Sequence, residues 1–212
     1  MSRTFEFAGP AGRLEALLDE PDQGREPRAA VVMAHPHPEH GGTMHTKVVF
    51  RAAKAFQRIG CAVLRFNFRG VGVSDGAYDG GEGEREDFRA ALELMAGRYP
   101  TVELWAAGFS FGAWVALSVG ATNDRVALLL GISPAVARRS FDELRDNSKP
   151  KFFIHGERDE LCPLADMRQL YGELEEPKEL VVIDGADHLF DGKTLEVGDA
   201  IEDLLSDWKG AS

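Results

Sequence analysis

The segment Val102–Gly120, "VELWAAGFSFGAWVALSVG", decides the fold of this chain. An apolar, strand-like run ends at Ala107, a helix-like run begins at Ala113, and the pentapeptide "GFSFG" joins them. In this strand–turn–helix context, a G-x-S-x-G motif puts its serine on a strained turn with the hydroxyl raised above the end of a sheet. The two glycines remove side chains that would collide in such a turn. We therefore expect Ser110 to be a nucleophile and the Phe111 amide, at a helix N-terminus, to bind a developing oxyanion.

Strand-like and helix-like runs alternate on both sides of this segment. Short apolar or alternating runs predict strands at Thr4–Phe7, Arg13–Leu18, Ala29–Ala34, Ala62–Phe68, Val102–Ala107, Val126–Ile132, Lys151–Ile154 and Glu179–Ile183. Helices are expected at Thr46–Arg58, Glu84–Arg98, Phe111–Ala121, Leu164–Leu174 and Leu195–Trp208. The order predicts a single α/β domain over residues 1–212, with about eight strands in a mostly parallel, doubly wound sheet and helices on both faces.

A serine nucleophile needs a general base, and the base needs a partner that fixes its tautomer. Asp159 follows one strand-like run in "FFIHGERDELCP", and His188 follows the next in "VVIDGADHLF". Because the carboxyl ends of parallel strands share one edge of a sheet, both loops should open where Ser110 emerges. We expect His188 to be the base and Asp159 the acid that orients it, since Asp187, as the neighbour of His188, points elsewhere. Weaker candidates for the acid are Asp184 and Asp142.

Five stretches carry a resemblance to a known family: "AHPHPEHGGTMHTKVV", "LRFNFRGVGVSDG", "AGFSFGAWVAL", "FFIHGERDELCP" and "ADHLFDGK". Together they resemble the α/β-hydrolase superfamily, and within it the small, lid-less bacterial group similar to dienelactone hydrolase. The resemblance implies the α/β-hydrolase fold without a cap domain. It also implies Ser110 as nucleophile, Asp159 as acid and His188 as base.

The loop "HPHPEHGG" at 35–42 permits two interpretations. The resemblance implies that it supplies the second half of the oxyanion hole, with the His37 amide as donor because the prolines on either side have no N–H. His35 should then brace the loop by hydrogen bonding. The alternative is a metal-dependent hydrolase, because histidine and glutamate are common zinc ligands. Such a site needs further ligands on later strands, where only His155 and His188 remain, so we expect no metal and no organic cofactor.

Two further stretches look functional but are expected to be structural. "RGVGVSDG" at 69–76 follows a strand, yet its G-x-G-x-x-x-G spacing misses the dinucleotide-binding fingerprint, so we expect Arg69 and Ser74 to be scaffold. The acidic "DGGEGERED" at 79–87 should be a solvated loop that feeds carboxylates into a helix N-terminus, where the helix dipole favours them.

Composition and charge limit the classes of partner. The net charge of −11 disfavours nucleic acids and anionic membrane surfaces, so a neutral small-molecule substrate fits better. No apolar run approaches the roughly 20 residues of a membrane span, and the first residues lack a signal-peptide core, so we expect a cytoplasmic protein. Two cysteines form neither a disulfide framework nor a metal motif: Cys61 should be core and Cys162 a loop thiol.

These observations lead to one expected function and one alternative. We expect a carboxylesterase-like or thioesterase-like serine hydrolase that acts on a small ester or thioester through an acyl-enzyme intermediate. The alternative is a non-catalytic ligand-binding protein on the same scaffold, because fold does not fix function. The sequence indicates neither the physiological substrate nor the oligomeric state.

Overall fold

Eight strands form one sheet in the computed structural model, which describes residues 2–21 and 26–208. The strands are β1 (Ser2–Gly9), β2 (Gly12–Asp19), β3 (Ala29–Ala34), β4 (Ala62–Phe66), β5 (Glu103–Phe109), β6 (Val126–Ile132), β7 (Lys151–Gly156) and β8 (Lys178–Ile183). Their order across the sheet is β1-β2-β4-β3-β5-β6-β7-β8. β2 pairs antiparallel with β1 and β4, and all other pairs are parallel. The sheet is therefore mostly parallel, as the sequence predicted.

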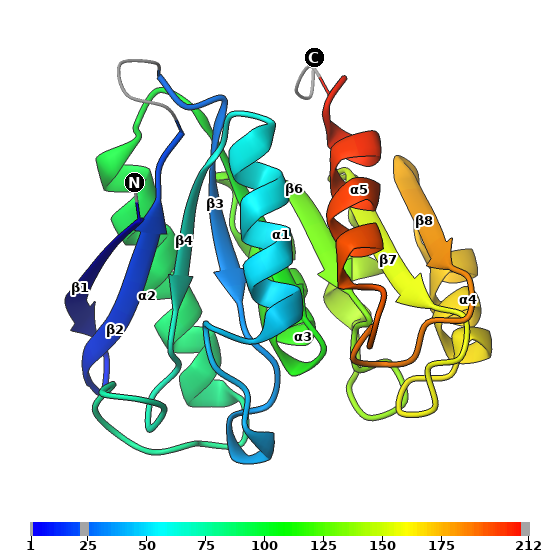
Figure 1. The fold of residues 1–212 in the computed structure, drawn as a ribbon. Helices are drawn as coiled ribbons and strands as arrows, with labels where there is room; N and C mark the ends of the chain where they lie inside the picture. The colour runs from blue at the N-terminus through cyan, green and yellow to red at the C-terminus, as the bar shows by residue number, and fades with distance from the viewer. Residues whose placement is uncertain (1, 22–25, 209–212) are drawn as a thin grey trace.

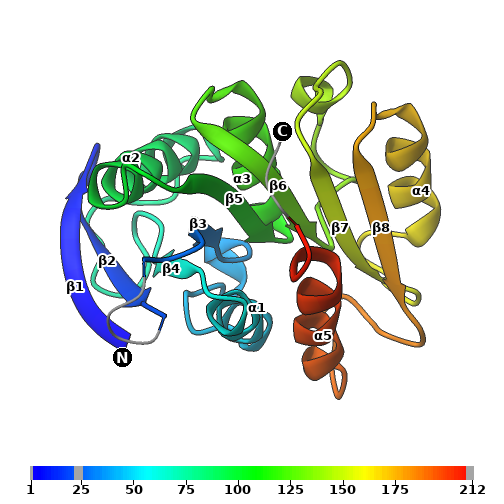
Figure 2. The same cartoon turned by 90° about the horizontal axis from the view of Figure 1, so that it is seen from above.

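Helices cover both faces of this sheet (Figure 1). α1 (Lys47–Arg58) and α5 (Thr194–Leu205) lie on one face. α2 (Glu82–Arg98), α3 (Phe111–Thr122) and α4 (Leu164–Glu173) lie on the other. Figure 2 shows the same three layers from above. The parallel strands point toward the lower edge in Figure 1, so the loops that follow β3, β5, β6 and β7 gather there.

Strand burial follows from these layers. All six residues of β3 are buried, because helices cover both of its faces. Val31 and Met33 pack toward α1, whereas Val32 and Ala34 pack toward α2 and α3. In β2, by contrast, Leu14 and its alternate neighbours are buried while the residues between them are partly exposed, as expected for an antiparallel strand near the sheet edge.

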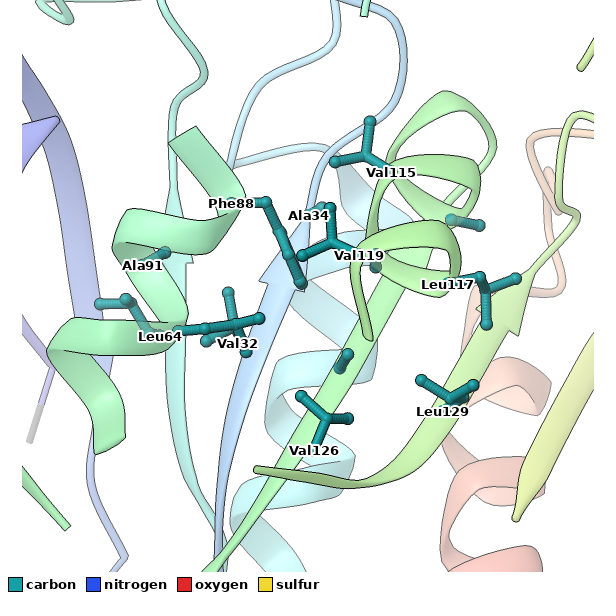
Figure 3. Packing of buried hydrophobic residues seen from close by; sticks show 14 of the residues in the cluster. Val32, Ala34, Leu64, Phe88, Ala91, Val115, Leu117, Val119, Val126 and Leu129 are labelled. Carbon is teal, nitrogen blue, oxygen red and sulfur yellow. The ribbon is translucent and has the colours of Figure 1, made fainter. Parts of the chain in front are cut away.

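Helix α3 is buried on all sides, from Phe111 to Ala121. It lies against the sheet, against α2 and against the connection between β6 and β7, and a helix that is apolar all round is stable only in such a position. Figure 3 shows Phe88 of α2 and Val119 of α3 beside Val32 and Ala34 of β3. Burial of each larger side chain among them, such as Phe88 or Val119, contributes roughly 1.5–3 kcal/mol. This packing fixes the N-terminus of α3, directly after Ser110.

Most element boundaries differ from the sequence expectation by one to three residues, and two of these shifts have a clear physical cause. β4 ends at Phe66 and not at Phe68, because the Phe68 amide leaves the sheet ladder and donates to the ring of His35. α2 begins at Glu82 and not at Glu84, since the Glu84 carboxylate accepts the amides of Asp79 and Gly81 and so caps the helix.

The acidic stretch at 79–87 is not wholly solvated, which corrects that expectation. Glu84 and Asp87 are fully buried. Asp87 accepts two bonds from the Arg69 guanidinium, at 3.0 and 2.7 Å, so Arg69 does serve as scaffold. Ser74 also has a scaffold role, because its hydroxyl donates to the Asn67 carbonyl and accepts the Glu15 amide. Local sequence gave no signal for this burial, because the partner Arg69 precedes the helix by many residues.

No cap domain covers the carboxyl edge of the sheet. The connection from β6 to β7, residues 133–150, contains only the short 3-10 helix η2 (Asp142–Leu144). That connection therefore places no helical layer over the loops at the carboxyl edge. Among the described residues, no helix is both long and apolar enough to cross a membrane.

Candidate active site

Ser110 stands on the turn between β5 and α3 with a backbone φ of 56° and ψ of −116°. A positive φ at a residue other than glycine costs roughly 1–3 kcal/mol, so the surroundings must impose it. The Ser110 N–H donates to the Ile132 carbonyl oxygen of β6 at 2.9 Å. A Cβ at Gly108 would lie 2.2 Å from the carbonyl oxygen of Gly112, so only glycine fits there. The turn thus displays the Ser110 hydroxyl at the carboxyl edge of the sheet.

Three side chains that the sequence singled out form one hydrogen-bonded chain at this edge. Ser110 Oγ lies 2.9 Å from His188 Nε2, and His188 Nδ1 lies 2.8 Å from Asp159 Oδ2. Because an ionised carboxylate only accepts, Nδ1 carries the proton and Nε2 is free to accept the proton of Ser110. His188 is 8% exposed and Asp159 is 4% exposed, so little water competes for these bonds. The arrangement can remove a proton from Ser110 and stabilise the resulting imidazolium.

Asp159 is held by the backbone of its own loop. Its Oδ1 accepts the amides of Leu161 at 3.0 Å and Cys162 at 2.8 Å, which leaves Oδ2 for His188. Burial alone would raise the pKa of Asp159. The hydrogen bond and charge of His188, with the Cys162 amide, outweigh burial and hold that pKa below its ordinary value. The carboxylate is therefore ionised at neutral pH.

The loops that carry Asp159 and His188 approach each other at Gly156. A Cβ there would lie 2.6 Å from the carbonyl oxygen of Ala186. Asp187 is exposed, and its carboxylate accepts the Asp191 amide at 3.0 Å, whereas the carboxylate bonded to His188 is that of Asp159. The other two carboxylates considered, Asp184 and Asp142, are exposed as well.

His35 braces the "HPHPEHGG" loop from inside the protein. It is fully buried; its Nε2 accepts the Phe68 amide at 3.1 Å, and its Nδ1 donates to the Pro36 carbonyl oxygen at 2.6 Å. Burial lowers the pKa of His35 to about 4, so the ring is neutral at pH 7. With both nitrogens occupied, His35 cannot join His37 in binding a metal ion. The hydrogen bonds of the two His35 nitrogens therefore do not fit the interpretation of this loop as a zinc site.

Phe111 and His37 place two free amides beside Ser110. Within the described part of the chain, neither backbone N–H has a hydrogen-bond acceptor. The two rings lie 5.0 Å apart, and both residues line the same cavity as Ser110. Free amides in this position can donate to an oxygen that acquires negative charge.

This cavity has a volume of about 550 Å³ and contains Ser110 and His188. Phe111, Ala135 and Leu161 supply apolar wall, and Leu161 is 54% exposed at the rim. Arg138 and Arg139 also line it, and none of its described lining residues is a carboxylate. Neither arginine was expected at the site from the sequence.

One other group of side chains could be considered for a metal ion. Among the described residues, ligand atoms of Asp159, Cys162 and His188 lie within 4.8 Å of one another. Burial, followed by the charge of Asp159, raises the pKa of the Cys162 thiol to about 12. Metal ions bind the thiolate and not the thiol, and the other two side chains are already bonded to each other. The group does not fit a resident metal.

The sheet order and the strained Ser110 turn between β5 and α3 define an α/β hydrolase, here without a cap. Residues 25–146 match the model of the hydrolase family described as Serine aminopeptidase, S33, and this chain belongs to that family.

Solved structures and one sequence relative are similar over almost the whole chain. An α/β serine hydrolase homologue from Coxiella burnetii is 38% identical, with a TM-score of 0.90, over 96% of this chain and 97% of that one. A serine hydrolase without lid from Xanthomonas campestris is 33% identical, with a TM-score of 0.92, over 100% and 96%. An uncharacterized protein of Rickettsia prowazekii is 37% identical over 208 residues, or 94% of this chain and 87% of the relative. The chain is therefore a hydrolase by family.

Proposed function

We propose that this chain is a serine esterase that cleaves small carboxylic esters or thioesters through an acyl-enzyme intermediate on Ser110. The observation that carries the proposal is the unbroken hydrogen-bonded chain from Ser110 through His188 to Asp159, with bonds of 2.9 and 2.8 Å. A nucleophile, a base and an orienting acid are the groups that acyl transfer requires.

In the proposed reaction, Ser110 Oγ attacks the carbonyl carbon while His188 Nε2 takes the hydroxyl proton. The carbonyl oxygen becomes an oxyanion, which accepts hydrogen bonds from the Phe111 and His37 amides. His188 then gives its proton to the leaving alcohol or thiol as the carbonyl re-forms. Water repeats the sequence on the acyl-enzyme: His188 takes a water proton, the acid departs, and Ser110 recovers its hydrogen. Asp159 remains ionised and orients the imidazole throughout.

The lining of the cavity supports an ester over an N-terminal peptide as substrate. An aminopeptidase must hold the α-ammonium group of its substrate, which calls for carboxylates or several carbonyl acceptors close to the nucleophile. No described lining residue of this cavity is Asp or Glu, and Arg138 and Arg139 would repel an ammonium group. The absence of a cap between β6 and β7 leaves the cavity accessible to small dissolved molecules.

Covalent labelling tests the proposal. A fluorophosphonate probe should modify wild-type protein once, at Ser110, and the same protein should hydrolyse p-nitrophenyl butyrate. The Ser110→Ala variant should do neither.

Ser118→Ala is the matched control. Ser118 lies on the same helix, and its buried hydroxyl has no hydrogen-bond partner in the described structure, so its loss should preserve folding, labelling and hydrolysis. Labelling that persists in Ser110→Ala, or a wild-type protein that neither labels nor hydrolyses esters, would refute the proposal. The second of these results would leave a non-catalytic binding protein.

A further inference from the structure

Two adjacent arginines, Arg138 and Arg139, line the cavity that holds Ser110 and His188. They belong to the connection between β6 and β7, the position at which a cap is absent. Arg138 is exposed, and no described residue accepts a hydrogen bond from its guanidinium. Its charge therefore faces the cavity and solvent without a fixed counterion.

Arg139 is held in place by neutral groups. Its Nη1 donates to the Gly80 carbonyl oxygen at 3.0 Å, and its guanidinium lies 4.3 Å from the Trp114 ring centre and 5.5 Å from that of Phe111. Stacking on aromatic rings orients a guanidinium but does not neutralise it. Among the described residues, no carboxylate forms an ion pair with Arg139. The planar fork is thus fixed beside the residue that follows Ser110.

Other arginines nearby do have carboxylate partners. Arg145, on the same connection, pairs with Asp142 and Glu173. Arg85, which also lies over the Trp114 ring, pairs with Glu82 and Glu143. The chain has 35 acidic residues against 24 lysines and arginines, so carboxylates are abundant. Two arginines without them at one cavity therefore form a local positive site on a negative protein.

The field of these arginines reaches into the cavity. Burial is the largest cause that lowers the pKa of His37; the charges of His40, Arg139 and Arg138 lower it further, and that of Glu39 opposes them. At Cys162, burial and the charge of Asp159 raise the pKa, and Arg138 opposes that rise. The charges of the two arginines therefore act on groups that line the cavity.

We propose that the substrate of this site carries, besides its ester or thioester bond, a carboxylate or phosphate group that Arg138 and Arg139 bind. The inference rests on the proposed esterase function and names its substrate class. A guanidinium that binds an oxyanion in a partly desolvated cavity forms charge-assisted bonds, of which Arg can offer two in parallel. The net charge of −11 repels an anionic substrate at long range, where salt screens the repulsion. The contacts with Arg138 and Arg139 act at short range, so the net charge does not rule them out.

Matched ester pairs test the inference. The acyl-side pair is p-nitrophenyl hydrogen adipate and p-nitrophenyl hexanoate, which have acyl chains of equal length with and without a carboxylate. The leaving-group set is p-(butyryloxy)benzoate, p-(butyryloxy)phenyl phosphate and neutral phenyl butyrate, which separates carboxylate from phosphate. The measured quantity is the ratio of kcat/KM for the anionic member to that for the neutral member, with rates of Ser110→Ala subtracted as background.

We expect a ratio of about 10 or more in at least one pair for the wild-type enzyme, which corresponds to one charge-assisted hydrogen bond. Arg138→Gln and Arg139→Gln should each lower that ratio about threefold, since the two arginines share it, and 0.5 M NaCl should lower it in the wild type, as screening requires. Arg139→Lys keeps the positive charge but loses the planar guanidinium, so its ratio should lie between those of the wild type and Arg139→Gln. The control is Arg168→Gln, which removes an exposed arginine of α4 outside the cavity and should keep the wild-type ratio.

Two results would overturn the inference: a wild-type ratio at or below 1 in every pair, or a ratio that Arg138→Gln and Arg139→Gln leave unchanged. A variant that merely disturbs the fold lowers both rates together and does not move the ratio. Cleavage of the neutral esters by wild type but not by Ser110→Ala would uphold the proposed esterase function even then.

Discussion

A Cβ on Gly112 would lie 2.3 Å from the carbonyl oxygen of His35, so helix α3 begins in direct backbone contact with the end of strand β3. The same added atom would lie 2.7 Å from the Ala34 carbonyl oxygen. Backbone oxygens at a strand end cannot rotate away as a flexible side chain can. This contact brings the Phe111 amide and the His37 loop to one cavity.

We predict that Gly112→Ala destabilises the protein by about 2 kcal/mol. Alanine would gain about 1 kcal/mol in helix propensity, but overpacking against backbone costs about 3 kcal/mol at this distance. Gly97, near the end of α2, is the matched control, because nothing lies within 4 Å of its Cβ position. Gly97→Ala should stabilise the protein by roughly 0.5–1 kcal/mol. Urea unfolding followed by circular dichroism measures both, and equal stability of Gly112→Ala and wild type would disprove the steric argument.

We predict that Asp159→Asn reduces kcat for p-nitrophenyl butyrate by about 10⁴, because the amide can hold His188 in the wrong tautomer. Asp187→Asn is the control: its side chain is exposed and bonds only the Asp191 amide, so kcat should change less than about threefold. Fluorophosphonate labelling rates should follow the same order. If Asp187→Asn proves the more damaging substitution, Asp159 is not the orienting acid.

Much of the fold was predictable because its signals are local. Strand and helix runs alternate along the chain, and the predicted strands and helices all appear, with small shifts at their ends. The placement of Ser110 follows from Gly108 and Gly112, whose missing side chains are required by contacts within the turn and with β3. The meeting of Asp159 with His188 followed from the rule that parallel strands end at one edge.

The two arginines that line the cavity, Arg138 and Arg139, were not predictable in the same way. "ARR" at 137–139 reads as a solvated stretch, since nothing in its neighbourhood marks a binding site. Arg139 is fixed by Trp114 and Gly80, which lie far from it along the chain. The burial of Glu84 likewise depends on a helix cap and on packing, which local polarity does not reveal.

We predict that the stability of the folded protein depends on pH through the buried, neutral ring of His35. Its pKa falls from 6.5 in a free side chain to about 4 in the folded protein, so between these values the unfolded chain binds a proton that the folded chain does not. Stability contributed by neutral His35 is therefore complete above pH 6.5 and is lost as pH falls toward 4, by about 3 kcal/mol. Urea unfolding between pH 7.5 and 4.5 should show this slope.

The slope should be shallower in His35→Gln, which cannot titrate, even if that variant is less stable at every pH. His45→Gln removes an exposed histidine and should keep the wild-type slope. Identical slopes in His35→Gln and wild type would mean that His35 is not neutral and buried in solution.

Neutral esters should show a short optimum of acyl chain length. The cavity of about 550 Å³ is open at Leu161, and no cap extends its apolar wall. Each methylene gains about 0.8 kcal/mol, or about fourfold in kcat/KM, only while wall remains to bury it. For p-nitrophenyl esters from acetate to palmitate, kcat/KM should therefore reach its maximum at about two to six carbons.

Leu161→Ala should lower kcat/KM for the hexanoate more than for the acetate, because it removes a side chain at the rim of the cavity that only the longer acyl chain reaches. Leu195→Ala, which removes a leucine of α5 that is 61% exposed outside the cavity, should change neither. A steady rise in kcat/KM to laurate and beyond would show an acyl channel that these loops do not form.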